Sequence, residues 1–359
     1  MRFLELCGSP FEIGLKHGKS LSELIRAFYA YLNIHVRQSK SVSSIISRIE
    51  KGLLDYYPES LEEIQGISEG SNLRYEDILM MIFASEIKFR TDFSDSLKGC
   101  TSFAATAEST VNGESLMGKT RDLANQGYYP YQIAMRIKKS SCFEVFLVEA
   151  FSGMVVTGCG INEKGLGLIL NTISEIKDYD ETLGVQRAFL ARIILEKCRN
   201  TSEAIDTISE YDLAYLGANF LVSDASGDCA VIEKSHRHQA LRFPKDGVIA
   251  MTNHFSEIAT SKFGIDPTKS SSLRFQQMNS LLNKNLGEID VELAKLFLQN
   301  HGSGFRDDSI CQHHPIKINT IQAYILDLTS GTIHLSDGHP CERQFIRLEK
   351  ESIEPIGQI

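Results

Sequence analysis

One short segment marks the change from a helical to a β-rich pattern: Ser96-Leu97-Lys98-Gly99-Cys100-Thr101-Ser102-Phe103. A loop-like run ends there in a glycine, and a strand-like run starts at a cysteine. Segments before it repeat apolar residues at helical spacing, whereas segments after it are short, β-rich and divided by turn signals. The sequence therefore predicts a helical N-terminal third followed by a sheet-rich remainder.

The Gly99-Cys100 junction is also chemically suggestive. A thiol that attacks the preceding carbonyl converts the amide into a thioester, and glycine before the nucleophile removes side-chain crowding. Hydrolysis would then free the Cys100 α-amine, whose reference pKa of about 7.7–8.0 suits a general base for its own thiol. The alternative interpretation of this dipeptide is an ordinary buried thiol, because short motif matches are often false.

Residues 1–92 have the pattern of a helical layer. Ser9 can cap a helix, Pro10 suits its first position and Glu12 completes a capping box. Helical spacing of apolar residues predicts helices over 9–32, 45–57, 61–67 and 75–89.

From Cys100 onward, blocks of strands alternate with blocks of helices. Turn signals such as Asn112-Gly113 separate strands predicted over 101–107, 115–120, 132–138, 143–150, 154–161 and 165–172. Helices over 186–199 and 202–209 precede strands over 219–224, 229–234, 239–243 and 247–253. Helices over 271–282 and 291–299 precede strands over 320–327, 332–335 and 344–348. This order predicts a layered α+β fold, and no repeat or linker divides residues 1–359.

Charge and hydropathy exclude several classes of partner. The chain has 46 acidic and 37 basic residues, a formal charge of −9, and no basic stripe, which argues against nucleic acid. It contains no run of about 18 uncharged apolar residues, and Glu5 interrupts the first residues too early for a signal peptide. We therefore expect a cytoplasmic protein with no membrane partner.

The cysteines and histidines show no spacing typical of a metal site. The 8 cysteines include no C-x-x-C pair, and the 10 histidines include no H-E-x-x-H motif. The His313-His314 pair lies in a loop-like stretch beside Pro315. We expect mostly buried thiols in a reducing compartment, with no metal and no cofactor.

Several sequence blocks occur in the order of one known family. They are Ser9-Pro10-Phe11-Glu12-Ile13-Gly14 with His17-Gly18, residues 58–70 (PESLEEIQGISEG), Gly99-Cys100-Thr101, Asn112-Gly113 with Gly118 and Asp122, Gly160-Ile161-Asn162 with Gly165, Asp224-Ala225-Ser226-Gly227, and Thr252-Asn253-His254. On these blocks the chain resembles the acyl-coenzyme A:6-aminopenicillanate (isopenicillin N) acyltransferase family, the C45 group of self-processing cysteine peptidase-like enzymes. The resemblance implies an N-terminal nucleophile (αββα) fold, two antiparallel sheets between helical layers, and cleavage before Cys100. The products would be an α chain, 1–99, and a β chain, 100–359.

The resemblance also implies roles for three residues besides Gly99 and Cys100. Asp122 matches a functional acid that would orient the new amine, although an isolated strand-end Asp more often caps a turn or pairs with a neighbour such as Arg121. Asn253 matches an oxyanion donor, and its amide can donate without carrying charge. Ser102 aligns with a hydroxyl residue used near the scissile bond.

Other positions depart from the family pattern. Lys317 is the nearest match to a family arginine, and lysine does not reproduce a bidentate clamp on a carboxylate. Arg121 stands where the family has tryptophan, and the chain has no tryptophan at all. The acyl or amine pocket must therefore be lined differently, with Phe103, Tyr128, Tyr129 and Tyr131 as candidates.

His254 suggests a Cys-His dyad, but an enzyme with an α-amine base does not need imidazole. We keep His254, Lys317 and Arg121 as possible supports for the substrate or oxyanion.

Besides a conventional Cys-His protease that acts in trans and uses His254, three functions remain open from the sequence. The first is an amidohydrolase that acts on a small-molecule amide or thioester, such as an N-acyl or aminoacyl amide, through an acyl-enzyme at Cys100. The second is an N-acyltransferase that uses acyl-CoA, which shares this intermediate; no glycine-rich or other coenzyme A signature favours it. The third is an unprocessed binding or interaction protein in which Cys100 is a buried thiol.

Overall fold

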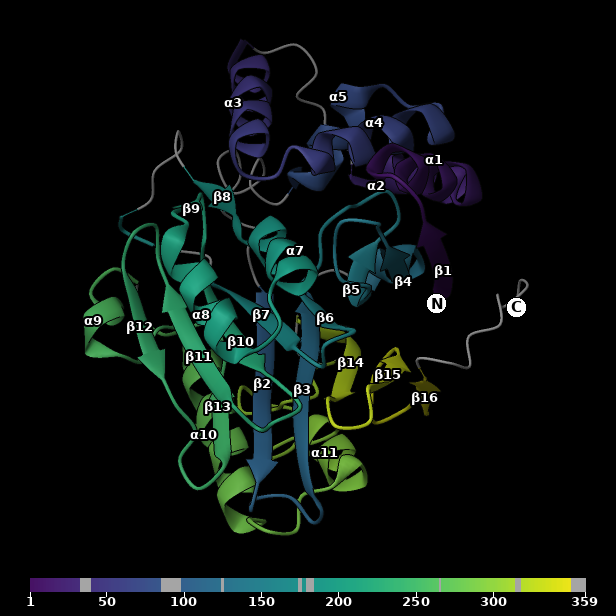
Figure 1. Cartoon of the computed structure of the whole chain (residues 1–359). Coiled ribbons are helices and arrows are strands. Elements are labelled where there is room, and N and C mark those ends of the chain that lie inside the picture. Colours follow the sequence, from purple (N-terminus) through teal and green to yellow (C-terminus); the bar gives the residue numbers. More distant parts are fainter. Residues whose placement is uncertain are drawn as a thin grey trace.

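Strands β2 (Lys98–Ala107) and β3 (Gly113–Leu123) form a hairpin at the centre of a six-stranded antiparallel sheet. The computed structural model describes residues 1–32, 40–84, 98–123, 126–173, 176–178, 184–264, 266–313 and 318–349 (Figure 1). Gly113 has a φ of +73°, so the predicted Asn112-Gly113 turn uses the conformational freedom of glycine. The strand order is β13 (Val248–Met251), β2, β3, β14 (Asn319–Asp327), β15 (Thr332–Asp337) and β16 (Phe345–Leu348).

A second sheet has eight strands. Their order is β1 (Arg2–Cys7), β4 (Gln132–Lys138), β5 (Val145–Phe151), β6 (Cys159–Asn162), β7 (Gly167–Ile173), β10 (Gly217–Ser223), β11 (Cys229–Lys234) and β12 (Gln239–Arg242). Neighbours are antiparallel except for β1 and β4, which are parallel. The short strands β8 (Val185–Gln186) and β9 (Leu213–Ala214) form a small parallel pair.

The two sheets lie face to face between helical layers. A buried apolar cluster fills the space between them, with members from both sheets such as Met117 and Ile169. Helices α10 (Lys269–Lys284) and α11 (Val291–Leu298) cover the outer face of the six-stranded sheet, where they enclose Phe103. This arrangement confirms the predicted α+β sandwich of two sheets between helical layers.

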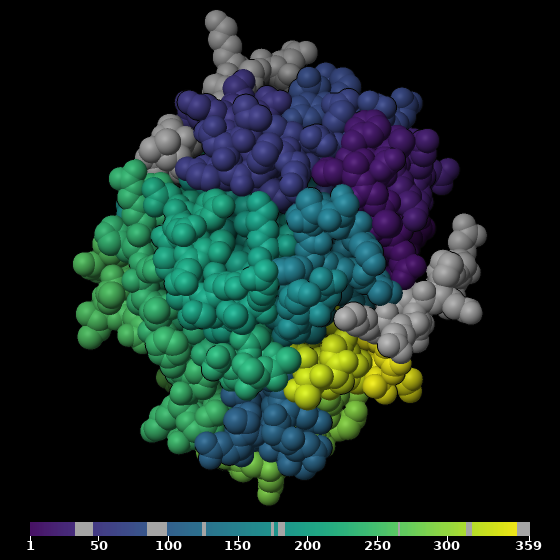
Figure 2. Space-filling view, viewed as in Figure 1, coloured from purple at the N-terminus to yellow at the C-terminus, as the bar shows by residue number. Residues whose placement is uncertain are grey.

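Helices from two parts of the chain cover the outer face of the eight-stranded sheet. They are α1 (Pro10–Ser20), α2 (Ser22–Leu32), α3 (Lys40–Tyr56), α4 (Glu59–Ser71), α5 (Tyr75–Ile82), α7 (Arg187–Lys197) and α8 (Thr201–Glu210). The short helices α9 (Ile258–Ser261) and η2 (Gln126–Tyr131) complete the described elements. Figure 2 shows the N-terminal residues, purple to blue, lying directly on the teal residues of the sandwich. Within the described ranges, no helix is long and apolar enough to span a membrane.

Three sequence predictions are wrong in detail. Residues 1–92 are not all helical, because Arg2–Cys7 forms the edge strand β1. Its partner β4 begins about 130 residues later in the chain, and Arg2 lies opposite Ile133. The helix expected over 9–32 breaks at Leu21, which leaves helical geometry with φ −122° and ψ 21°. The strand expected over 154–161 starts only at Cys159.

The predicted capping box and the first family block meet at a close helix crossing. Ser9 N donates to Glu12 Oε2 at 2.8 Å, and Glu12 N donates to Ser9 Oγ at 3.4 Å. Helix α1 then crosses α4 so closely that a Cβ on Gly14 would lie 2.0 Å from Glu63 O. A Cβ on Gly66 of α4 would likewise lie 2.2 Å from Phe11 O. Glycine is therefore required on both helices for this approach.

A buried ion-pair network joins the N-terminal segment to the sandwich. Glu63 of α4 accepts from Arg192 of α7 at 3.1 Å, and both side chains are at most 1% exposed. Lys139 lies 3.7 Å from the same Glu63 oxygen and 2.9 Å from Glu196. Since two cations and two carboxylates share this site, each buried charge is compensated.

We predict that Glu63→Ala destabilises the protein by about 3–5 kcal/mol, because it leaves the Arg192 and Lys139 charges buried without this partner. The measurement is the free energy of unfolding in urea. Glu62→Ala is the matched control, because Glu62 is an exposed residue of the same helix and its loss should cost under about 0.5 kcal/mol. Equal effects of the two substitutions would contradict the prediction.

Candidate active site

Gly99 and Cys100 lie near the start of β2, at one end of the six-stranded sheet. Gly99 lies opposite Asp122 in the ladder between β2 and β3. On its other side β2 pairs with β13, and the chain that leaves β13 at Met251 brings Asn253 to Cys100. Pairing between strands far apart in the sequence therefore brings Cys100, Asp122 and Asn253 together at one end of the sheet.

A side chain at Gly99 would press against Gln312. A Cβ at this position would lie 2.9 Å from Gln312 Nε2 and 3.5 Å from Asp122 Oδ2. The glycine before the cysteine is thus favoured by packing as well as by the chemistry of attack. The sequence analysis did not identify Gln312.

The side chains of Cys100 and Ser102 face the eight-stranded sheet, as strand alternation requires. Ser102 Oγ donates to Asn171 Oδ1 of β7 at 2.9 Å. Cys100 is 8% exposed, and burial raises the pKa of its thiol, while the Lys119 ammonium acts in the opposite direction. The thiol therefore lies in a nearly closed site between the sheets.

A buried lysine and glutamate lie beside this thiol. Lys119 of β3 donates to Glu149 of β5 and, at 2.6 Å, to Leu170 O. Burial by itself would lower the pKa of Lys119, but Glu149 and the Cys100 thiol more than offset it, so the pKa is raised. Lys119 is consequently a cation near the nucleophile. Lys119 and Arg121 occupy alternate positions of a buried strand, and this pattern could have indicated Lys119 from the sequence.

Both backbone polar groups of Cys100 are held by side chains. The Cys100 N–H donates to Asn253 Oδ1 at 2.7 Å. The Cys100 carbonyl accepts from Arg274 Nη1 of α10 at 2.7 Å and from Asn171 Nδ2 at 3.5 Å. Arg274 is buried and carries no sequence motif, which is why the sequence analysis missed it.

The partners of Asn253 fix the orientation of its amide. Its Oδ1 faces the Cys100 N–H and lies 3.2 Å from Arg274 Nη2, both of which only donate. Its Nδ2 donates to Thr172 O at 3.0 Å, an atom that only accepts. In the uncleaved chain, therefore, the oxygen of Asn253 faces the nitrogen that cleavage would turn into the amine.

Asp122 lies on the opposite face of the sheet from the Cys100 thiol. Its carboxylate is fully buried and accepts from Thr320 Oγ1 at 2.6 Å, Gln312 Nε2 at 2.8 Å and Thr120 Oγ1 at 3.2 Å. Burial raises the pKa of Asp122 to about 6, although Arg274 and these hydrogen bonds oppose the rise. The Asp122 carboxylate is thus beside Gly99 on the helix-covered face, and from there its charge still acts to raise the pKa of the Cys100 thiol.

Three further candidates are Arg121, His254 and Lys317. Arg121 lies opposite Cys100 in the ladder, 3.5 Å from Glu149 and 4.0 Å above the Phe151 ring. The His254 ring nitrogen Nδ1 is within hydrogen-bond distance of Ser271 Oγ, at 2.8 Å, and of Thr252 Oγ1, at 3.1 Å. Lys317 lies outside the described residues.

Of the aromatic candidates, Phe103 packs under the α10 and α11 helices, on the face opposite the thiol, so its expected place in the substrate pocket is wrong. Tyr128 and Tyr131 pack around Phe28. The Tyr129 hydroxyl donates to Asp337 O at 2.7 Å.

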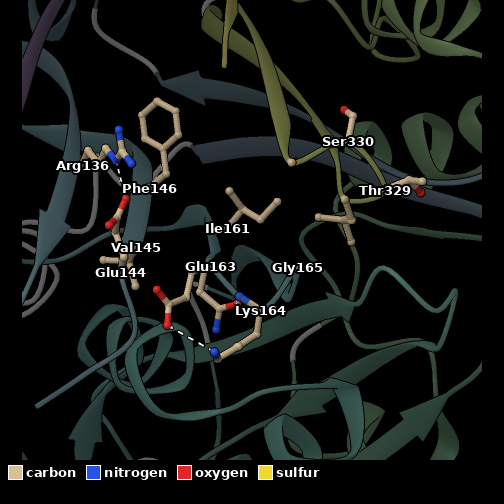
Figure 3. Close-up of a pocket in the computed structure, with 13 residues that line it drawn as sticks. Arg136, Glu144, Val145, Phe146, Ile161, Glu163, Lys164, Gly165, Thr329 and Ser330 are labelled. Atoms are coloured by element: carbon tan, nitrogen blue, oxygen red, sulfur yellow. Dashed lines mark hydrogen bonds and ion pairs between the residues drawn. The ribbon is translucent and has the colours of Figure 1, made fainter. Parts of the chain in front are cut away.

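A pocket of about 270 Å³ opens at the far end of the sandwich (Figure 3). Its walls include Phe146, Ile161 and the β14–β15 turn at Thr329, and an ion pair joins Arg136 to Glu144 at its rim. Leu328, which follows β14, lines it, whereas Cys100 lies near the opposite end of this strand. The pocket is therefore separate from the candidate site.

The family block at Asn162 is structural here. Its Nδ2 donates to the carbonyls of Leu195 and Cys198 at the end of α7, at 2.9 and 2.8 Å. Its Oδ1 accepts from Lys164 N and Leu166 N, which holds the turn after β6.

The comparison with protein families finds one match. Residues 109–341, well over half of the chain, match the family described as acyl-coenzyme A:6-aminopenicillanic acid acyl-transferase. The matched region begins after Cys100 and includes Asp122 and Asn253.

Relatives by sequence and by structure are distant. An uncharacterized protein of Archaeoglobus fulgidus is 21% identical over 364 residues, which cover 86% of this chain but only 60% of that longer protein. A mutant of conjugated bile acid hydrolase from Clostridium perfringens has a TM-score of 0.51 at 14% identity, covering 72% of this chain and 95% of that one. Penicillin V acylase from Agrobacterium tumefaciens has a TM-score of 0.47 at 15% identity, covering 71% and 87%. The bile acid hydrolase shares the fold, in agreement with the predicted N-terminal nucleophile architecture.

The pKa of Asp122 predicts a pH effect on stability. Because its folded-state pKa is raised from 3.8 to about 6, the folded protein retains a proton there that the unfolded chain loses between these values. This carboxyl therefore lowers stability as pH rises through that window, by on the order of 3 kcal/mol in total. Asp122→Asn lacks this contribution.

Urea unfolding at several pH values from about 4 to 7 tests it, since the stability of Asp122→Asn relative to wild type should rise with pH. A difference that is flat or falls would contradict the prediction.

Proposed function

The chain belongs to the acyl-coenzyme A:6-aminopenicillanic acid acyl-transferase family, and we propose that it is a self-processing cysteine enzyme of the N-terminal nucleophile class. In this proposal it cleaves its own Gly99-Cys100 bond and then acts on amide bonds of small N-acyl or aminoacyl substrates. The geometry around Cys100 supports the cleavage step, whereas the substrate class follows from membership of this family.

One observation carries the proposal: the backbone of Cys100 is held on both sides of its Cα. Asn253 accepts from its N–H and Arg274 donates to its carbonyl, both at 2.7 Å. Both partners follow residue 100 in the chain, so cleavage leaves them in place. The new α-amine would remain against the same Asn253 oxygen.

The processing step forms a C–S bond as a C–N bond breaks. The Cys100 thiol adds to the Gly99 carbonyl carbon, its proton goes to the Cys100 nitrogen, and the amide becomes a thioester with a free amine. Water then hydrolyses the thioester, which restores the thiol and leaves a carboxylate on Gly99. The Lys119 ammonium stabilises the attacking thiolate electrostatically, which opposes the effect of desolvation on the pKa of the Cys100 thiol.

The same groups would act on substrate. The amine accepts the thiol proton, the thiolate attacks the substrate carbonyl, and the proton passes to the leaving amine. Asn253 holds the amine through Oδ1, and the second hydrogen on its Nδ2 is our candidate oxyanion donor, next to the one given to Thr172.

Asp122 has a positioning role in this proposal. It lies on the other face of the sheet and interacts electrostatically with Arg274, so it acts through the residue that holds the Cys100 carbonyl.

Access to the thiol would follow cleavage. Cys100 is nearly closed off in the uncleaved chain, with Lys98 and Gly99 paired to β3 beside it. Once the bond is cut, these two residues become a chain end and can leave the ladder. The space bordered by Gln312, Arg274 and Asp122 around Gly99 would then be available next to the nucleophile.

Intact mass under denaturing conditions tests self-cleavage. We expect two fragments that meet at residues 99 and 100, and a single full-length chain for Cys100→Ala, because the nucleophile is removed. Cys159→Ala is the matched control, since this thiol is also buried between the sheets but should leave cleavage intact.

Wild-type protein that stays whole after prolonged incubation would favour the unprocessed binding protein instead. A whole chain with protease activity that is lost in His254→Ala would indicate a Cys-His enzyme.

A substrate screen with processed protein separates hydrolysis from acyl transfer. We expect amine release from N-acyl amino acids or β-alanyl amines without any added acceptor, and a fall of about 10³-fold or more in Cys100→Ala. Release is measured by mass spectrometry, with acyl-CoA thioesters assayed in parallel. Turnover that requires both an acyl-CoA and an amine acceptor would assign the protein as an N-acyltransferase.

A further inference from the structure

Two histidine and two cysteine side chains, of the kinds that bind metals, come together at one point outside the candidate active site. His301 follows α11, Cys311 and His313 lie in the loop before β14, and Cys341 lies in the turn between β15 and β16. One ligand atom from each lies within 4.8 Å of the others. The sequence analysis expected no metal because these residues have no short motif spacing; three separate segments bring them together.

Three of the six distances between ligand atoms match those of a tetrahedral site, and the other three are at most 4.8 Å. Cys311 Sγ lies 3.6 Å from Cys341 Sγ, Cys341 Sγ lies 3.3 Å from His313 Nε2, and the two Nε2 atoms of His301 and His313 are 3.1 Å apart. Ligands on a tetrahedral Zn²⁺ would be separated by about 3.8 Å for S and S, about 3.6 Å for S and N, and about 3.3 Å for N and N. Each observed distance is within about 0.3 Å of these values.

Two simpler explanations fit less well. A disulfide needs sulfur atoms about 2.0 Å apart, which the 3.6 Å separation of Cys311 and Cys341 excludes for this arrangement. Hydrogen bonds also link the four side chains in a row, from Cys311 to Cys341, on to His313 and then to His301, but such a row does not require all four ligand atoms to lie within 4.8 Å of one another. A cation at the centre would account for all four.

We propose that His301, Cys311, His313 and Cys341 bind one Zn²⁺ ion. Two thiolates and two imidazoles are a donor set that selects zinc over harder cations such as Mg²⁺ and Ca²⁺. Since the protein supplies all four tetrahedral ligands, no position is left for substrate or water, and the site is structural.

Surrounding rings fix the two imidazoles. The Phe305 ring lies 4.2 Å from the His301 ring and 4.8 Å from the His313 ring, centroid to centroid. The His339 ring is tilted by 31° against the His313 ring at 4.6 Å, and its own Nδ1 lies 2.8 Å from Thr320 O. These packed rings restrict rotation of the two imidazoles.

A second group of possible ligands is weaker. Glu59, Cys142 and Glu196 also come together, but Lys139 lies 2.9 Å from Glu196 and 3.9 Å from Glu59. Lys139 and Arg192, which lies 2.7 Å from Glu196, already pair with these carboxylates. The proposal therefore rests on the His and Cys group alone.

The zinc site has a structural link to the proposed cleavage site. Gln312 lies between the ligands Cys311 and His313, and its Nε2 donates to Asp122 Oδ2 at 2.8 Å. Its backbone N–H also donates to Thr320 Oγ1 at 2.8 Å. Metal binding on either side of Gln312 would therefore fix the amide that packs against Gly99. This consequence depends on the proposed function, whereas metal binding does not.

Metal analysis of the purified full-length protein tests the site directly. We expect about one zinc per chain by elemental mass spectrometry, and less than a tenth of this in Cys311→Ser and in His301→Ala. Cys198→Ser, which changes a buried thiol elsewhere, should keep the metal. Cys100→Ala should also keep it, so that failure of self-cleavage and failure of zinc binding are distinguishable.

The wild-type protein decides the question even if a ligand variant does not fold. After chelation, folded protein should take up one equivalent of Co²⁺, with the visible absorption and thiolate charge-transfer bands of a tetrahedral site, and Zn²⁺ should displace it. Folded protein that binds neither ion would overturn the proposal, as would a Cys311–Cys341 disulfide in freshly purified, metal-free protein. In the zinc-free protein, self-cleavage should be slower and recover when Zn²⁺ is added.

Discussion

The hydrogen bond from the Cys100 N–H to Asn253 Oδ1 connects the sheet to the proposed chemistry. It forms because β13 pairs with β2, so that Asn253, two residues after the end of β13, lies beside Cys100. Arg274 reaches the same pair from α10, donating to the Cys100 carbonyl and lying 3.2 Å from the Asn253 oxygen. Cys100, near the end of an interior strand, is thus fixed by the segment after a neighbouring strand and by the covering helix, and both fix it through its backbone rather than its thiol.

The two faces of the β2–β3 hairpin carry separate charge clusters. Lys119 and Glu149 lie with the thiol between the sheets, whereas Asp122 and Arg274 lie under the helices. Each buried charge has an opposite charge nearby, which limits the cost of desolvation. The strand separates the two clusters sterically, but charge still acts across it, because the Asp122 carboxylate on one face acts to raise the pKa of the Cys100 thiol on the other.

Local signals predicted much of this structure. The change from helical to strand spacing near residue 100, the Asn112-Gly113 turn and the capping box at Ser9 all depend on nearby residues, and all agree with the structure. Strand β1, Lys119, Arg274 and Gln312 were not identified, because their roles come from contacts between distant segments. The same limit hid the group around Cys311: its members lie up to 40 positions apart, from His301 to Cys341, and no short motif contains them.

A site that first cuts its own chain and then acts on other molecules needs partners that do not move when the chain is cut. The side chains that hold or surround Cys100, namely Asn171, Asn253, Arg274, Lys119 and Glu149, all follow the cleavage point. The N-terminal segment is instead held at a distance from the bond, by β1 in the eight-stranded sheet and by Glu63 against Arg192. Cutting after Gly99 therefore changes connectivity at one buried position while both sets of contacts persist. The loop that carries Gln312 must also stay in place, and an ion bound on either side of that residue would hold it there.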